Sequence, residues 1–146
     1  MNSSRYIGLS APPFHGIIER VKIFEYAQAL HLHNPIHFDR LAAQAAGYRD
    51  VVVPPGFLNP FSLQPRASKF ETFQINEHKA LAGEWSWEHY ADVCAGDELH
   101  GQSVLVELGE KHGKRPMHVL VIETKYMNAK GENAVTVRDV TLEFKE

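Results

Sequence analysis

The sequence has little cysteine, little excess charge and no long apolar run, and each shortage excludes a class of protein. The single cysteine, Cys94, cannot form an internal disulfide. A net charge of −3 offers no basic surface for nucleic acid. The longest apolar runs are far shorter than the roughly 20 residues that a membrane-spanning helix needs. With no signal-peptide pattern at the N-terminus, these features predict a cytoplasmic protein that binds neither nucleic acid nor membrane.

The composition is that of an ordinary globular domain. The chain has 146 residues, of which 44% are hydrophobic and 23% are charged. These values disfavour disordered and fibrous classes. We therefore expect one domain, residues 1–146, built around one hydrophobic core.

The first third of the chain has the spacing of helices. In residues 17–30, apolar side chains recur every three or four positions, which predicts an amphipathic helix that begins near residues 19–22. A short strand is expected just before it, near residues 15–18. Asp39 is placed to cap a second short helix and Gly47 to end it.

The next segment combines apolar residues with several prolines. Residues 51–53 are too short and too close to proline to form a central strand. We predict that residues 56–63 form a buried helix entered through two prolines, with Pro60 and Pro65 limiting its length.

The second half of the chain has the alternation of β-strands. Four segments of alternating apolar and polar residues are separated by short connections rich in Gly, Asn and Asp, as in turns between antiparallel neighbours. The apolar phase shifts near Arg138 and Asp139, which predicts a β-bulge there. The overall prediction is an α+β fold with helices collected on one face of an antiparallel sheet. The four predicted strands are residues 84–93, 98–108, 116–127 and 134–144.

The stretch HLHNPIH, residues 31–37, carries three histidines around an Asn-Pro step. It has three open interpretations. It can be a polar loop in a His-rich chain. His31, His33 and His37 can ligate zinc and leave an open position. Finally, a histidine titrating near neutrality can serve as a general acid or base.

The sequence segments around this stretch favour the acid/base interpretation. IIERVKIFEYAQAL, NPIHFD, AAGYRDVVVPPGFL and GEWSWEHYADVCAGDEL, in this order, resemble the MaoC-like dehydratase and hydratase family. The branch it resembles most is the dehydratase domain of fungal-type fatty acid synthase, and the resemblance runs through almost the whole chain. It implies a hot dog fold, in which an antiparallel sheet wraps a central buried helix and two units pair. It also implies a thioester substrate of coenzyme A or acyl carrier protein. We expect no cofactor, and no metal at the histidines, because Pro35 fixes the backbone between them and no acidic ligand lies at a confirming distance.

The family motif is D-x-N-P-x-H, in which the Asp and the His share one water. This sequence matches it with Asn34, Pro35 and His37, but Leu32 stands at the Asp position. Leucine can neither accept a proton nor orient a water. The resemblance therefore assigns catalysis to His37 and Asn34 and leaves the carboxylate partner missing.

The resemblance also suggests where substrate binds. Hydration of a 2-enoyl thioester needs donors for the enolate oxygen that forms during the reaction. Gly56 matches the position where backbone amides at a helix start would supply them. Leu32 and Pro55 complete the predicted substrate contacts. A simple turn is the alternative role of Gly56, because Pro-Pro-Gly is a common turn sequence.

Two functions of different classes follow. The first is a 2-enoyl thioester hydratase or 3-hydroxyacyl thioester dehydratase, with His37 as acid and base. The second is a non-catalytic acyl-binding subunit of a heteromeric hydratase, which Leu32 favours. Either would act as a homodimer or as a heterodimer with a paralogous hot dog chain. Trp85, Trp87 and Tyr90 can line an acyl tunnel, although aromatics on a strand also form cores and interfaces.

Overall fold

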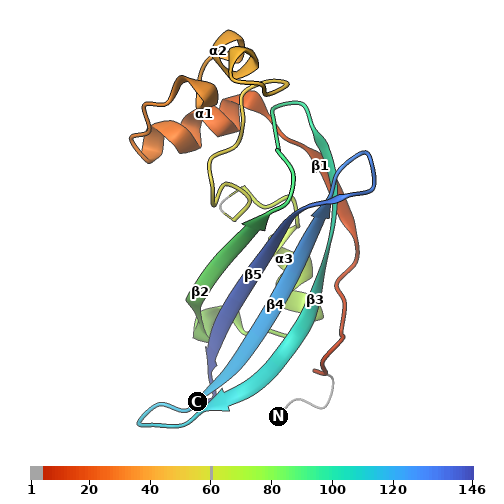
Figure 1. Ribbon diagram of the computed structural model, residues 1–146. Coiled ribbons are helices and arrows are strands. Elements are labelled where there is room, and N and C mark those ends of the chain that lie inside the picture. Colours follow the sequence, from red (N-terminus) through yellow and green to blue (C-terminus); the bar gives the residue numbers. More distant parts are fainter. Residues whose placement is uncertain (1–4, 60) are drawn as a thin grey trace.

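The computed structural model describes residues 5–59 and 61–146. An antiparallel sheet of five strands, in the order β1-β3-β4-β5-β2, is the main element (Figure 1). Strands are thus present where the alternating pattern predicted them, and the first strand is also confirmed. The bounds are Phe14–Ile17 for β1, Ala80–His89 for β2, Glu98–Lys111 for β3, Met117–Met127 for β4 and Asn133–Phe144 for β5.

Strand β2 differs from its prediction in extent and in neighbour. It begins at Ala80 and leaves the sheet after His89, so residues 90–93 are not part of it. It pairs with β5 and lies at the sheet edge, whereas β3 pairs with β1 and β4. The sequence predicts that the Ala95-Gly96-Asp97 turn joins neighbouring strands. This is wrong, because β2 and β3 are not neighbours in the sheet.

The bulge predicted near Arg138 and Asp139 is wrong. The pairing of β5 with β4 runs without a shift from Val135 to Phe144. The irregularity between β2 and β5 lies on β2, at Gly83. Strand β5 keeps its alternation, but its inward positions change from apolar to polar residues after Val137: Asp139, Thr141 and Glu143 are all buried.

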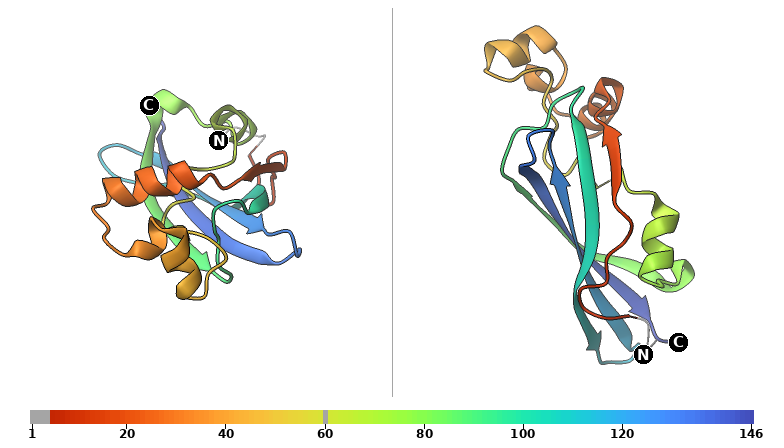
Figure 2. Two further views of the ribbon diagram at one scale, coloured as in Figure 1. Left: turned by 90° about the horizontal axis from the view of Figure 1, so that it is seen from above. Right: turned by 90° about the vertical axis from the view of Figure 1, so that its right-hand side faces the viewer.

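Three helical elements gather at one end of the sheet (Figures 1 and 2). They are α1 (Arg20–Ala29), the 3₁₀ turn η1 (Pro35–His37) and α2 (Arg40–Ala45). Helix α1 has the predicted bounds. Asp39 caps α2 as predicted, because its carboxylate accepts the backbone N–H of Leu41 at 2.9 Å.

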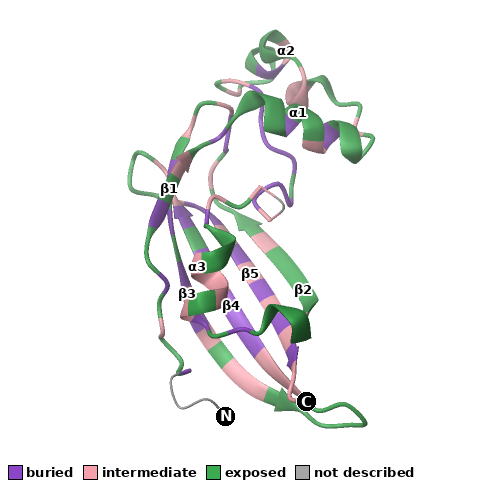
Figure 3. Ribbon diagram, turned by 180° about the vertical axis from the view of Figure 1, so that it is seen from behind, coloured by how far each residue is buried: buried purple, intermediate pink, exposed green. Residues whose placement is uncertain are grey.

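The helix predicted for residues 56–63 does not form. Residues 56–59 and 61 lie in turns and residues 62–63 are irregular, while Pro60 lies outside the described residues. Proline at 60 and 65 cannot donate a helical hydrogen bond, which explains the interruption. A helix of seven residues, α3 (Arg66–Thr72), begins only after Pro65 and lies against one face of the sheet (Figures 2 and 3). The 3₁₀ turn η2 (Glu77–Lys79) leads from it into β2.

The buried residues form two clusters at different heights of the sheet. One cluster joins α1 and the turn residues Phe57 and Leu58 to the sheet around Tyr126. The other packs Phe73 and Ile75, which follow α3, against strands β3 and β4. None of the helices in residues 5–59 and 61–146 is long and apolar enough to cross a membrane.

Candidate functional site

Asn34 and Pro35 build the turn that carries His37. The side-chain oxygen of Asn34 accepts the backbone N–H of Ile36 at 3.2 Å and so caps η1. Pro35 occupies the first position of this turn, where its missing N–H costs nothing. Asn34 therefore fixes the backbone that presents His37.

The imidazole of His37 is held through its Nδ1 atom. Nδ1 lies 2.7 Å from the carbonyl oxygen of Val52. Because a carbonyl can only accept, Nδ1 carries a proton, and in the neutral form of the ring the lone pair lies at Nε2. The Val52 backbone N–H in turn donates to the Ile36 carbonyl at 3.1 Å. The ring thus has one defined tautomer with a basic nitrogen.

His31 and His33 have different surroundings. His31 has a positive φ of 55° and closes α1: its N–H donates to Gln28, and the N–H of Leu32 donates to Ala27. This is the Schellman arrangement of a helix end. Both histidines are exposed, whereas Leu32 is half-buried. Among the residues that the structure describes, no three His, Cys, Asp or Glu side chains gather into a metal site.

Gly56 lies in a tight turn and not at a helix start. The N–H of Phe57 donates to the Pro54 carbonyl at 3.2 Å, and Gly56 has a φ of 84°, the pattern of a type II turn. The predicted donors at a helix N-terminus are therefore absent from this segment. Gly56 is buried, and a Cβ there would lie 2.8 Å from the Tyr26 hydroxyl. Pro55 is exposed, and its carbonyl accepts that hydroxyl at 3.3 Å.

A cavity of about 780 Å³ lies between the segment 56–70 and strands β2, β4 and β5. Gly56, Tyr26 and, on β2, Trp85 and Trp87 are among its lining residues. A Cβ at Gly56 would lie 3.6 Å from the Trp87 ring, so these two residues are neighbours. That the two tryptophans line an acyl tunnel stays a prediction. Tyr90 is exposed and does not line the cavity. Of the predicted site residues, the structure brings only Gly56 into the cavity within one chain. His37, Asn34, Leu32 and Pro55 are not part of its lining.

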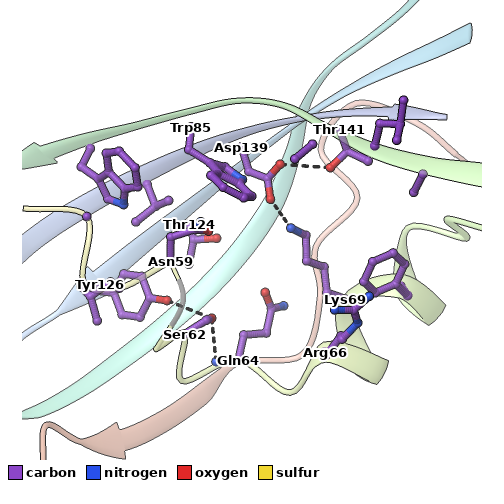
Figure 4. Close-up of a pocket in the computed structure, with 18 of the residues that line it drawn as sticks. Asn59, Ser62, Gln64, Arg66, Lys69, Trp85, Thr124, Tyr126, Asp139 and Thr141 are labelled. Carbon is purple, nitrogen blue, oxygen red and sulfur yellow. Dashed lines mark hydrogen bonds and ion pairs between the residues drawn. The ribbon is translucent and has the colours of Figure 1, made fainter. Parts of the chain in front are cut away.

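The cavity lining is more polar than an alkyl chain requires (Figure 4). The ammonium group of Lys69 pairs with the carboxylate of Asp139, whose other oxygen accepts the Thr141 hydroxyl at 3.0 Å. Figure 4 shows these groups at the end where α3 faces β5. A second set lies nearer to Tyr126, whose hydroxyl is 3.3 Å from that of Ser62.

A buried hydroxyl pair connects the lining to the sheet interior. The Ser103 hydroxyl donates to the Gln64 side-chain oxygen at 2.9 Å and lies 2.6 Å from the Thr124 hydroxyl. Burial raises the pKa of the nearby Tyr126 phenol more than its Ser62 contact lowers it, so the phenol is protonated at neutral pH. The part of the lining around Tyr126 therefore presents neutral hydrogen-bonding groups.

Sequence reasoning missed these polar residues because they come from separate elements. Gln64 and Lys69 follow the predicted buried helix, whereas Asp139 and Thr141 lie on the last strand. One signal was available: Asp139, Thr141 and Glu143 follow Val135 and Val137 in the same alternating register of the last strand. Polar residues at inward positions indicate partners inside the fold.

Comparison with known proteins indicates the same family as the sequence motifs. Residues 5–137 match the family model of the FAS1-like dehydratase domain region. A UPF0336 protein of Leifsonia xyli is 32% identical over 128 residues, which cover 86% of this chain and 82% of that protein.

Solved structures of dehydratases have the same fold as this chain. The HadBC (3R-hydroxyacyl-ACP dehydratase) complex of Mycobacterium tuberculosis has a chain with a TM-score of 0.80 at 20% identity, with 94% of this chain and 97% of that chain covered. A MaoC-like dehydratase has a TM-score of 0.82 at 25% identity, and this chain covers 42% of its length. These likenesses confirm the predicted hot dog fold.

Proposed function

Because the chain belongs to the FAS1-like dehydratase region family, we propose that it hydrates 2-enoyl thioesters and dehydrates 3-hydroxyacyl thioesters, with His37 as acid and base. The acyl group would be carried by coenzyme A or acyl carrier protein. The observation that carries this proposal is the 2.7 Å contact between His37 Nδ1 and the Val52 carbonyl. It leaves Nε2 as a base in a turn that Asn34 fixes.

The proposed reaction needs two proton transfers. The oxygen of a water molecule bonds to C3 of the enoyl thioester, and one of its protons passes to Nε2 of His37. The resulting enolate takes up a proton at C2 from the imidazolium, which restores the neutral ring. The product is the 3-hydroxyacyl thioester, and atoms balance with one water consumed. We assign Gly56, Pro55 and Leu32 to the substrate side of this site.

Leu32 supports a second candidate, a non-catalytic acyl-binding subunit. An isobutyl side chain at that position offers no second acid or base beside the water. A partner chain would then supply the chemistry, and this chain would supply the cavity. The HadBC complex is named as an assembly of two different chains, which makes a heterodimer as reasonable a proposal for this protein as a homodimer.

His37→Gln tests the enzymatic proposal. Glutamine keeps a donor for the Val52 carbonyl but has no basic nitrogen, so hydration of a short 2-enoyl-CoA should fall about 10²-fold or more. His33→Gln, at an exposed histidine four positions earlier, should leave the rate unchanged. Equal rates for wild type and His37→Gln would exclude His37 as the base.

A further inference from the structure

We propose that the cavity binds an acyl chain that carries a neutral oxygen, a keto or hydroxyl group, beyond the reacting carbons. This inference rests on the proposed function and names its substrate class. It comes from two side-chain N–H groups on the cavity lining. The Nε2 atom of Gln64 and the Nε1 atom of Trp87 are both buried, and neither has a hydrogen-bond partner among the described residues.

Gln64 is held in place by one half of its amide. Its side-chain oxygen accepts the Ser103 hydroxyl at 2.9 Å, and its backbone N–H donates to the Ser62 hydroxyl at 3.2 Å. The residue is only 9% exposed. Figure 4 shows its amide directed into the cavity between Ser62 and Lys69. The amide is thus oriented by the protein through its oxygen, while its buried donor half has no partner among the described residues.

Trp87 provides a second donor from the opposite side of the cavity. It lies on β2, whereas Gln64 comes from the segment that precedes α3. An indole nitrogen can only donate. A buried donor without a partner destabilises the fold, so a ligand that accepts these hydrogens recovers free energy that a hydrocarbon chain does not.

The charges of the lining indicate that the ligand's oxygen is neutral. Among the described residues of the cavity, the charged side chains form two ion pairs, Lys69 with Asp139 and Arg66 with Glu77. Each cation is already matched by an anion. A carboxylate or phosphate at the chain end would therefore find no free positive charge, whereas a keto or hydroxyl oxygen needs only the N–H donors.

The ligand must also tolerate the apolar parts of the cavity. Leu58, Phe70 and Trp85 line it beside the polar groups. A mixed lining of this kind fits a chain of carbon atoms with one or two oxygen substituents, and neither a plain alkyl chain nor a sugar.

Binding of saturated acyl-CoAs tests this proposal without turnover. Octanoyl-CoA and its 5-oxo, 6-oxo, 7-oxo and 7-hydroxy derivatives lack the 2,3 double bond, so the protein cannot hydrate them. Titration calorimetry should show at least one oxygenated chain binding about tenfold more tightly than octanoyl-CoA. Gln64→Leu should reduce this preference to less than threefold, and the matched control Gln28→Leu, at an exposed glutamine of α1, should keep it.

Trp87→Phe provides an independent variant if Gln64→Leu does not fold. It removes the indole N–H and keeps an aromatic ring, so the preference should again fall. Equal binding of octanoyl-CoA and every oxygenated chain would overturn this inference alone, because water would then satisfy both donors. Failure of all five acyl-CoAs to bind would overturn the proposed function together with the inference.

Discussion

The three histidines of residues 31–37 are close in sequence but have separate roles. His31 takes the left-handed conformation that ends α1, and His33 is exposed. His37 alone is held by a buried backbone carbonyl. The three histidines are close in sequence because the end of α1 is followed directly by a capped turn. These two local structures place the imidazoles in different environments.

Gly56 combines a positive φ with a close neighbour, so replacement by alanine should be costly. A Cβ in the left-handed region costs about 1–2 kcal/mol, and at Gly56 it would also lie 2.8 Å from the Tyr26 hydroxyl. Gly131 has a φ of 76° with no atom within 4 Å of its Cβ position. Gly56→Ala should therefore lower the free energy of unfolding in urea by at least about 1 kcal/mol more than Gly131→Ala. Equal losses would mean that Tyr26 moves aside freely.

Strand β5 shows how a correct observation led to a wrong interpretation. Its apolar residues do change phase after Val137. A bulge is the usual cause when the inward face is entirely apolar. Here the alternation continues: Asp139 and Glu143 face inward toward Lys69 and Arg5, which come from distant segments, and Thr141 donates to Asp139. Sequence alone could not supply those partners.

The buried pair between Arg5 and Glu143 on β5 predicts acid sensitivity. The two side chains are 4% and 7% exposed and lie 2.6 Å apart. Burial raises the pKa of the Glu143 carboxyl, but hydrogen bonds from Arg5 and the Asn76 backbone outweigh it and hold the pKa below its usual value of 4.5. A carboxyl whose pKa falls on folding stabilises the protein above pH 4.5, and this stability is lost as the pH falls through the folded-state pKa.

Glu143→Gln tests that pair. It leaves the Arg5 charge buried without its carboxylate, so it should lower the free energy of unfolding by about 3 kcal/mol at pH 7 and by less at pH 3. The control Glu107→Gln removes the carboxylate of an exposed pair with Arg138, and it should cost less than about 1 kcal/mol. Urea denaturation at both pH values measures each loss. A loss for Glu143→Gln that does not shrink in acid would contradict the linkage.

Helices α1 and α2 were predictable because local signals specify them. Apolar spacing predicted the bounds of α1, although only Ile23 and Ala27 are buried on it, and the Asp39 cap marks the start of α2. The segment 56–63 had similar apolar content, yet the prolines within and around it and the positive φ of Gly56 give turns. Proline and glycine therefore decided the conformation of this segment, and its hydrophobic content did not.

The cavity is a property of the assembled molecule. It lies where the irregular segment before α3 and α3 itself face strands β2, β4 and β5. The motif with His37 was found from sequence because its residues are contiguous. The polar lining was not found because its members lie up to about 80 residues apart and meet only through the sheet order.

Pairing of two chains is expected from the edge of the sheet. Strand β2 is hydrogen-bonded to β5 on one side only, and its Leu81 and Trp85 are 49% and 43% exposed. Such an edge favours association with another strand. Light scattering of the dilute protein should give the mass of a dimer or a larger assembly. A monomer that also fails to pair with a paralogous chain would contradict this expectation.

A double-mutant cycle at Leu32 and His37, read out as the rate of hydration of a short 2-enoyl-CoA, tests whether the Asn34-Pro35 turn is an acid/base site that lacks its carboxylate. We predict that Leu32→Asp raises kcat/KM about 10²-fold or more and that His37→Ala lowers it below the wild-type value. The double variant should be no faster than His37→Ala, with circular dichroism confirming that all four proteins are folded. A gain from Leu32→Asp that survives His37→Ala, or a wild-type rate unchanged by His37→Ala, would show that His37 is not the working base.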